Sequence, residues 1–322
     1  MSDLIIQPGE KPDAPPAVFI MGPTATGKTD LAIQLYNELP CELISVDSAL
    51  VYRGMDIGTA KPEPEVLAEA PHHLIDIIDP AENYSAGQFR NDTLRLMQGG
   101  FQAGHTPVLV GGTMLYFNTL QKGMADMPDV SPEIRQAIAR EAKDKGMAAM
   151  HARLQQVDPV SAQRIHPNDP QRIKRALELY DSTGKTLTEF WAGQKRQESR
   201  FPWARIKIAL VPPDRIELRK RITRRFDGML KQGFIEEVEA LYQRGDLDAE
   251  MPSIRAVGYR QVWAYLAGEY GFDEMREKAI IATAQLAKRQ MTWLRKETEC
   301  NFIDPLTLNS VKVLKNLKIL LS

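Results

Sequence analysis

Short apolar runs separated by stretches with helical spacing make up the first 123 residues. The apolar runs occupy residues 17–21, 42–47, 74–79 and 107–110. Between them, apolar residues recur at intervals of three and four, which is typical of amphipathic helices. One such helix is expected to begin after residue 85 and to end near residues 99–100. Strands that alternate with helices in this way form parallel sheets. The sequence therefore predicts an α/β fold, a parallel sheet flanked by helices.

The pattern changes over residues 124–199, where the strand signal disappears. Ser131 and Pro132 have the positions of an N-cap and a first helical turn, and further helices are predicted over 147–157 and 170–179. The run 206–211 restores a strand, and helices are predicted over 254–266, 273–297 and 311–321. We predict a flexible N-terminal tail at 1–16, a catalytic core at 17–123 and 200–322, and an inserted small all-helical domain at 124–199.

Composition sets modest bounds on the class of protein. The chain has 322 residues, of which 43% are hydrophobic and 26% charged, as expected for a globular protein of one or two domains. A net charge of −1 neither supports nor excludes nucleic-acid binding. Cys41 and Cys300 match no metal-ligand spacing, and no apolar run approaches membrane-spanning length. The polar, Pro-rich start does not resemble a signal peptide. We expect a cytoplasmic protein without a membrane partner.

The strongest chemical signal directly follows the first apolar run. It has the spacing G-x-x-x-x-G-K-[ST] of a phosphate-binding loop. Two glycines let successive backbone N–H groups point inward, a lysine adds a full positive charge, and the final hydroxyl is suited to Mg²⁺. The loop consists of Gly22, Pro23, Thr24, Ala25, Thr26, Gly27, Lys28 and Thr29. By itself it is typical of nucleotide-binding and ATP-binding proteins, and it is equally compatible with another diphosphate.

Two further predicted strands end in residues that can carry chemistry. Asp47 is the last residue of the second apolar run, and Gly111, Gly112 and Thr113 follow the fourth. Ligands of parallel α/β sheets bind at the carboxyl ends of the strands. Asp47 opens a long loop that we interpret as a substrate loop, with helix capping or Mg²⁺ binding as the alternative. A P-loop ATPase usually has an aspartate where this chain has Thr113, so typical ATPase machinery is not visible.

Basic residues recur through the second half of the chain. Arg172, Lys174 and Arg175 share one predicted helix, and further cations follow over 215–231 and 255–296. Each run alone is typical of a solvated helix face, but their repetition in a near-neutral chain favours a surface that binds a polyanion. Two readings remain open on these residues. One is an ATP-dependent small-molecule kinase, and the other is a nucleotide-gated RNA-binding module without catalysis.

Several segments resemble the bacterial tRNA dimethylallyltransferase family. They are the phosphate-binding loop and residues 47–62, 111–116, 168–178, 255–261 and 286–293, which follow the family's order over nearly the whole chain. The resemblance implies a P-loop NTPase-like fold and the transfer of a dimethylallyl group from dimethylallyl diphosphate to N6 of adenosine 37 in tRNA. A relative that prenylates free adenine nucleotides is an alternative. The basic helical insert argues against it, because a mononucleotide has no stem to bind.

The resemblance also implies roles for individual residues. Asp47 would be the catalytic base, and Thr113, also in the catalytic centre, would contact the acceptor or the diphosphate. The phosphate-binding loop would hold the diphosphate together with Arg221 or Arg225, and Mg²⁺ would bind at Thr29. The anticodon stem-loop of tRNA would be bound by the helical insert and by the core, mostly through phosphates, and a monomer is the simplest expectation. The implied tRNA contacts are Asp47, Ser48, Ala49, Leu50, Thr113, Arg135, Gln171, Arg172, Ile173, Lys174, Arg175, Ser253, Ile254, Arg255, Ala256, Val257 and Gly258.

Overall fold

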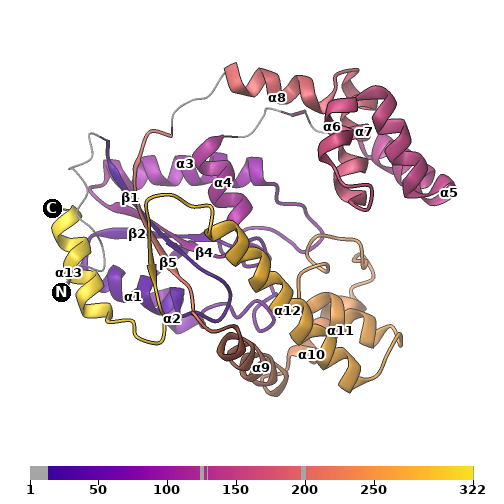
Figure 1. Ribbon diagram of the computed structural model, residues 1–322. Helices are drawn as coiled ribbons and strands as arrows, with labels where there is room; N and C mark the ends of the chain where they lie inside the picture. Colours follow the sequence, from indigo (N-terminus) through magenta and orange to yellow (C-terminus); the bar gives the residue numbers. More distant parts are fainter. Residues whose placement is uncertain (1–13, 124–126, 129, 197–200, 322) are drawn as a thin grey trace. The chain divides into compact units, whose positions relative to one another are not determined.

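A computed structural model describes residues 14–123, 127–128, 130–196 and 201–321. The chain forms two compact units (Figure 1). The first unit comprises Met1–Leu120 and Pro202–Ser322, and the second comprises Gln121–Phe201, each as far as it is described. The first unit carries every strand found among the described residues, and the second is helical.

A parallel sheet forms the centre of the first unit. Its six described strands have the order β3-β2-β4-β1-β5-β6, and each neighbouring pair is parallel. This confirms the predicted α/β class. The central strand is buried along five of its six residues, as expected where helices cover both faces. The strands are β1 (Pro16–Met21), β2 (Cys41–Val46), β3 (His72–His73), β4 (Thr106–Gly111), β5 (Ala204–Leu210) and β6 (Cys300–Ile303).

Alternate side chains of the strands pack on opposite faces of the sheet. Val18 and Ile20 belong to a cluster that includes Leu35 of one covering helix and Leu317 of another. Phe19 points to the other face, where its ring lies 5.3 Å from that of Phe117. The first unit includes the helices α1 (Lys28–Glu38), α2 (Pro64–Glu69), α3 (Ala86–Gln102), α4 (Met114–Lys122) and α13 (Ser310–Leu321).

A second hydrophobic cluster joins the loop that follows β2 to a group of C-terminal helices. Tyr52 and Met55 of the loop are buried together with Phe226, Phe234 and Tyr259 of the helices. The rings of Phe234 and Tyr259 meet edge to face at 5.1 Å. The long loop is therefore part of a core, although its sequence shows little apolar periodicity. The helices are α9 (Arg215–Lys231), α10 (Phe234–Gln243), α11 (Tyr259–Leu266) and α12 (Phe272–Leu294).

The second unit is a small helical assembly with its own core. Buried Ile138, Leu154, Ile173 and Leu177 pack together within it. Gly146 has φ 78° and interrupts the first helix, because a left-handed residue cannot continue a right-handed helix. The helices are α5 (Pro132–Val157), α6 (Pro159–Arg164), α7 (Pro170–Thr183) and α8 (Leu187–Arg196).

Three sequence-based expectations are corrected by the structure. The strand predicted over 74–79 is wrong: β3 ends at His73, and Leu74 and Asp76 have φ values of 64° and 55°, which are incompatible with a strand. The helix predicted to begin at residue 254 begins at Tyr259, after turns. The predicted tail at 1–16 overlaps the sheet, because Pro16 belongs to β1. Residues 1–13 of that tail lie outside the described residues.

Candidate active site

The ends of three adjacent strands form the base of the candidate site. Strand β4 lies between β1 and β2, and its Gly111 is in register with Met21 on one side and Val46 on the other. The residues that follow these partners therefore leave the sheet at one level. A Cβ atom on Gly111 would stand 2.0 Å from the Val46 carbonyl oxygen, so this close approach requires glycine. The register brings together the phosphate-binding loop, Thr113 and Asp47.

The phosphate-binding loop presents an open helix end to the site. Gly27 is the N-cap of α1 with φ 78°, and no side chain among the described residues caps this helix. The first N–H groups of α1 therefore remain available to an anion. The Thr26 hydroxyl and the Lys28 ammonium group both donate to the Pro23 carbonyl oxygen, at 2.9 and 2.7 Å. These bonds fold the loop and hold the lysine across it.

Two cations and one carboxylate dominate the electrostatics of the site. Desolvation of the Lys28 ammonium group and the nearby charge of Arg225 lower the pKa of Lys28 to about 8, although Asp47 opposes the shift. Burial also lowers the pKa of Arg225, again against the effect of Asp47. The three groups therefore lie close enough to interact electrostatically. Two desolvated cations that share one carboxylate favour the binding of an additional anion.

Asp47 and Thr113 are joined through the peptide that links Asp47 to Ser48. One carboxylate oxygen of Asp47, Oδ1, accepts from the backbone N–H groups of Ala49 and Leu50 at 2.8 and 3.4 Å. The other oxygen has no hydrogen-bond partner within the described part of the chain. The Thr113 hydroxyl accepts from the Ser48 N–H at 3.1 Å. Asp47 therefore caps a turn with one oxygen, as one of the two readings expected, and keeps the second oxygen for other chemistry.

A cavity of about 530 Å³ opens above these residues, within the range of roughly 300–1,000 Å³ that is typical of small-molecule sites. Its walls come from the strand ends, from the loop after β2, from α9, from the segment before α11 and from α12. They combine charged and apolar side chains. The lining residues include Thr24, Lys28, Thr29, Asp47, Ser48, Ala49, Leu50, Gly58, Thr59, Ala60, Thr113, Arg225, Arg255, Ala256, Val257, Gly258, Tyr259, Leu286, Arg289, Gln290 and Trp293.

The two arginines predicted to bind the diphosphate differ in their position relative to the cavity. Arg225 lines the cavity, and its Nη2 donates to the Thr59 carbonyl oxygen at 3.4 Å. Arg221 lies one helical turn away on α9 and is not among the residues that line the cavity. Of the two arginines that the sequence left undecided, Arg225 is thus the one placed beside Lys28.

The predicted tRNA contacts fall into different environments. Arg255, Ala256, Val257 and Gly258 line the cavity together with residues 47–50. Ser253 is buried and its hydroxyl donates to the Pro80 carbonyl oxygen at 2.6 Å, and Ile254 is buried in the core. These two side chains hold the segment in place and do not face an RNA.

In the second unit, Arg135, Gln171 and Arg172 are exposed, while Lys174 and Arg175 are half-buried. Ile173 is completely buried in the core of that unit. Its position between cations in the sequence conceals its inward direction, because residue 173 lies on the apolar face of α7 together with Leu177. The expectation that the Ile173 side chain contacts tRNA is therefore not supported by its burial.

Gln290 is a site residue that the sequence analysis did not identify. Its Oε1 accepts from the Thr24 N–H at 3.3 Å, and its Nε2 donates to the Gly112 carbonyl oxygen at 2.9 Å. One side chain of α12 thus ties the phosphate-binding loop to the end of β4. Gly112 leaves room for this contact, because a Cβ there would stand 2.5 Å from the Gln290 amide nitrogen. The contact spans 266 residues of sequence, which no local pattern reveals.

Two structural features are absent from the described part of the chain. In the ranges given above, no group of three or more His, Cys, Asp or Glu side chains is arranged to hold a metal ion. A cation in the cavity would therefore have few protein ligands, and the Thr29 hydroxyl and the Asp47 carboxylate are the candidates that line it. None of the helices in the same ranges is long and apolar enough to cross a membrane.

The sheet and the phosphate-binding loop define an α/β protein of the P-loop class. The model of the IPP transferase family matches residues 50–297. The tRNA dimethylallyltransferase of Thioalkalivibrio sulfidiphilus is 62% identical over 285 residues, which cover 88% of each chain. The corresponding enzyme of Methylococcus capsulatus is 55% identical over 292 residues, with 91% of this chain and 93% of that one covered. The chain belongs to the IPP transferase family.

Solved structures agree with this assignment. The tRNA isopentenylpyrophosphate transferase of Bacillus halodurans is 34% identical and superposes with a TM-score of 0.69, covering 95% of this chain and 96% of that chain. A eukaryotic dimethylallyltransferase acting on tRNA is 25% identical, with a TM-score of 0.77 and coverage of 95% and 78%. The family resemblance expected from the sequence motifs is confirmed.

Proposed function

We propose that the protein transfers the dimethylallyl group of dimethylallyl diphosphate to N6 of adenosine 37 in tRNA and releases diphosphate. The observation that carries this proposal is the meeting of the phosphate-binding loop, Asp47 and Thr113 in one cavity, in a member of the IPP transferase family. The same cavity offers an anion site, a carboxylate and apolar walls, which are the three environments that this reaction requires.

The diphosphate would bind at the N-terminus of α1, between Lys28 and Arg225. Negative charge grows on its oxygens as the bond to the allylic carbon breaks, and donors fixed in advance stabilise that charge. The Thr29 hydroxyl fits a Mg²⁺ ligand, because it lines the cavity at the start of α1 and because Mg²⁺ accepts few protein oxygens beside phosphate oxygens and waters. When bound there, Mg²⁺ would neutralise part of the charge of the diphosphate.

The dimethylallyl chain would lie along α9. Ile222, Phe226 and Met229 line the cavity and lie within four residues of Arg225 on the same helix. A diphosphate held by the Arg225 guanidinium therefore places its hydrocarbon substituent beside apolar side chains. Burial of that chain stabilises the complex by about 0.8 kcal/mol for each CH₂ group.

The acceptor would approach from the side of Asp47. The N6 lone pair of adenine forms a bond to C1 of the dimethylallyl group, and the electrons of the C1–O bond leave with the diphosphate. The N6 proton passes to Asp47 Oδ2, the oxygen without a partner among the described residues. A base placed in this way contributes roughly 10²- to 10⁴-fold to the rate. The Thr113 hydroxyl accepts from the Ser48 N–H at 3.1 Å and so fixes the peptide group next to Asp47.

The tRNA would be recognised by both units. Adenosine 37 must leave its stack to enter the cavity, which costs a few kcal/mol, and residues 255–258 line the cavity where neighbouring nucleotides would pass. The exposed side chains of Arg135, Gln171 and Arg172 in the second unit would contact stem phosphates. We propose that the protein acts as a monomer.

One assay tests the proposal against its alternatives. Purified protein with Mg²⁺ and labelled dimethylallyl diphosphate is offered unmodified tRNA, the same tRNA with guanosine at position 37, or AMP. We expect label only on the tRNA with adenosine 37. Label on AMP would identify a free-nucleotide prenyltransferase, and label on neither acceptor would overturn the proposal. A parallel reaction with γ-labelled ATP tests the kinase alternative.

A further inference from the structure

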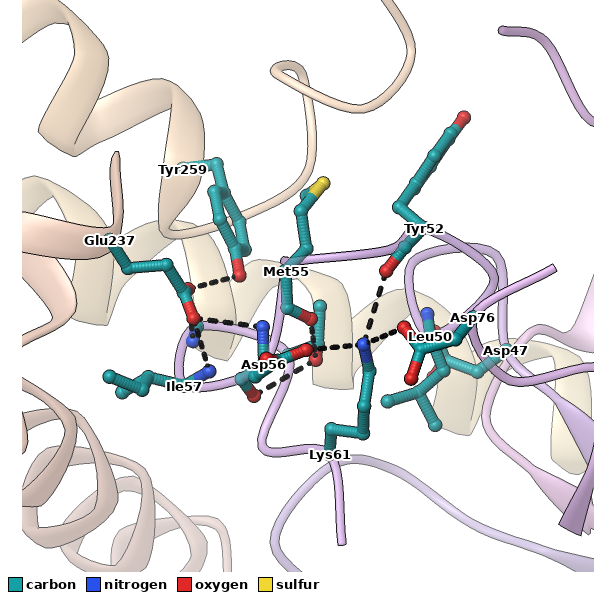
Figure 2. A network of polar contacts seen from close by, with 12 residues as sticks. Asp47, Leu50, Tyr52, Met55, Asp56, Ile57, Lys61, Asp76, Glu237 and Tyr259 are labelled. Atoms are coloured by element: carbon teal, nitrogen blue, oxygen red, sulfur yellow. Dashed lines mark hydrogen bonds and ion pairs between the residues drawn. The ribbon is translucent and has the colours of Figure 1, made fainter. Parts of the chain in front are cut away.

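Glu237, at the start of α10, holds the loop that follows β2 (Figure 2). Its Oε2 accepts from the backbone N–H groups of Asp56 and Ile57 at 2.8 and 2.7 Å. Its Oε1 accepts from the Gly58 N–H at 3.1 Å and from the Tyr259 hydroxyl at 2.5 Å. One carboxylate thus binds three consecutive peptide groups and the first residue of α11. Burial and the Glu237 charge raise the pKa of Tyr259, so its hydroxyl stays a donor.

The loop also packs tightly beneath this carboxylate. Gly58 lies against two aromatic rings: a Cβ atom there would stand 2.0 Å from Phe234 and 2.6 Å from Tyr259. Gly58, Thr59 and Ala60 line one wall of the active-site cavity, and Tyr259 lines another. Glu237 therefore connects two walls of the cavity, although its own side chain is not among the lining residues.

Lys61 closes the base of the same loop. Its side chain is only 4% exposed and donates to the Tyr52 carbonyl oxygen at 3.1 Å and to the carboxylates of Asp56 and Asp76. Figure 2 shows these bonds beside those of Glu237. Charge-assisted bonds of a nearly buried ammonium group are costly to break. The loop between Asp56 and Lys61 is thus fixed at both ends.

Among the described residues, one hydrogen bond links the fixed loop to a cation of the diphosphate site. The Thr59 carbonyl oxygen, one residue beyond the last N–H that Glu237 binds, accepts from Nη2 of Arg225 at 3.4 Å. Arg225 is the cavity cation beside Lys28. A shift of residues 56–58 would carry the Thr59 carbonyl with it and release the guanidinium from its orientation.

We propose that Glu237 is a positioning residue of the diphosphate site, which orients Arg225 by fixing residues 56–58 and with them the Thr59 carbonyl group. The inference rests on the proposed function, in which Arg225 binds the diphosphate. Glu237 does not touch the substrates in this scheme. Its effect on the reaction passes through the backbone and ends at the Arg225 guanidinium.

The substitution Glu237→Gln tests this role with little change in volume. A glutamine can accept at one of the two oxygen positions only. If its oxygen serves Asp56 and Ile57, its amide group faces the Gly58 N–H, and that bond is lost. We expect the Kd for inorganic pyrophosphate and the KM for dimethylallyl diphosphate to rise roughly tenfold, which corresponds to the loss of one charge-assisted hydrogen bond. The Kd for tRNA is expected to change less than about twofold, because none of the four groups that Glu237 binds belongs to a residue assigned to tRNA.

Glu236→Gln is the matched control. Glu236 is exposed and lies in the same first turn of α10, so its substitution removes the same charge from the same helix end. We expect wild-type pyrophosphate binding from this variant. Glu237→Asp keeps the charge but shortens the side chain, and it serves as the milder second variant if Glu237→Gln does not fold.

A double-mutant cycle with Arg225→Lys distinguishes positioning from a general loss of structure. If Glu237 acts through Arg225, its substitution has little further effect on pyrophosphate binding in the Arg225→Lys background. Full additivity of the two losses, or wild-type pyrophosphate binding by folded Glu237→Gln, would overturn the inference. Failure of the proposed function is a separate outcome, because it appears as the absence of labelled tRNA with the wild-type protein.

Discussion

Asp47→Asn is the most informative single substitution in the site, because it changes one oxygen of the carboxylate and can leave the other in place. Asp47 Oδ1 accepts from the Ala49 and Leu50 N–H groups at 2.8 and 3.4 Å, and an asparagine can retain both bonds through its own Oδ1. Only the second oxygen, which would take the N6 proton, becomes an amide group. The substitution thus removes the base and keeps the cap.

The structure allows the expected magnitude to be divided into two parts. Loss of a positioned base should lower kcat by roughly 10²- to 10⁴-fold, or about 3–5 kcal/mol of barrier. Two capping hydrogen bonds contribute about 1–2 kcal/mol in total, since the bond at 3.4 Å is long. Asp47→Asn should therefore lose kcat at nearly wild-type stability, whereas Asp47→Ala should lose both kcat and this local stabilisation.

The charge of Asp47 gives a further readout. Asp47 opposes the lowering of the pKa values of Lys28 and Arg225, so its neutralisation removes an anion from the wall of the diphosphate site and lowers the pKa of Lys28 further. We expect Asp47→Asn to bind pyrophosphate at least as tightly as the wild-type protein when both are titrated at pH 6, where Lys28 keeps its charge.

Single-turnover transfer of label to tRNA, together with calorimetric titration of pyrophosphate, measures both effects. A kcat within about tenfold of wild type would refute the assignment of Asp47 as the base. Weakened pyrophosphate binding would instead place Asp47 among the groups that hold the diphosphate or its cation.

Three further outcomes are expected. Thr113→Val removes the acceptor of the Ser48 N–H and should lower kcat about tenfold. Its stability should be nearly unchanged, because water can replace the bond at this exposed turn. Thr113→Ser keeps the hydroxyl group and should keep the rate near that of the wild type. Pyrophosphate affinity should fall up to tenfold per pH unit above about pH 8, where free Lys28 loses its proton, and Lys28→Arg should abolish this decline in direct titrations. Lys207→Met leaves the Glu297 carboxylate without its partner at 2.6 Å, in a place where both side chains are at most 15% exposed. It should lower the free energy of unfolding, measured in denaturant titrations, by about 3 kcal/mol. A second substitution, Glu297→Leu, should largely recover this loss.

The parallel sheet and the base of the site could be predicted because both depend on local patterns. Apolar runs followed by glycine, lysine or aspartate mark strand ends, and in parallel sheets the ends of neighbouring strands meet at one edge. The run at 74–79 shows the limit of this reasoning. Its apolar pattern is typical of a strand, but the backbone turns at Leu74 and Asp76, and the N–H groups of residues 76–78 donate to the carbonyl oxygens of Leu50 and Val51 in the loop that follows β2. Pairing with that loop here outweighs the local pattern.

The remaining site residues could not be predicted because their contacts cross long stretches of sequence. Gln290 reaches Gly112 over 178 residues, and Glu237 reaches Asp56 over 181. A glutamine or glutamate on a helix is most often a solvated side chain, and nothing in its immediate neighbours distinguishes it. Ile173 shows the reverse case, in which a run of cations drew attention to a side chain that is buried.

The position of the acid in the sheet favours a leaving group over an energy donor as the ligand of the loop. The strand next to β1 on the side of Asp47 is β4, and it is followed by Gly112 and Thr113. A P-loop ATPase usually has an acid at such a strand end to hold Mg²⁺. In this chain the acid, Asp47, lies one strand further out, directly after β2, and it lines the same cavity as Lys28 and Arg225. In the proposed reaction, the proton acceptor is thus separated from the α1 N-terminus by one strand. The nucleophile would then be deprotonated on one side of the cavity while the diphosphate leaves on the other.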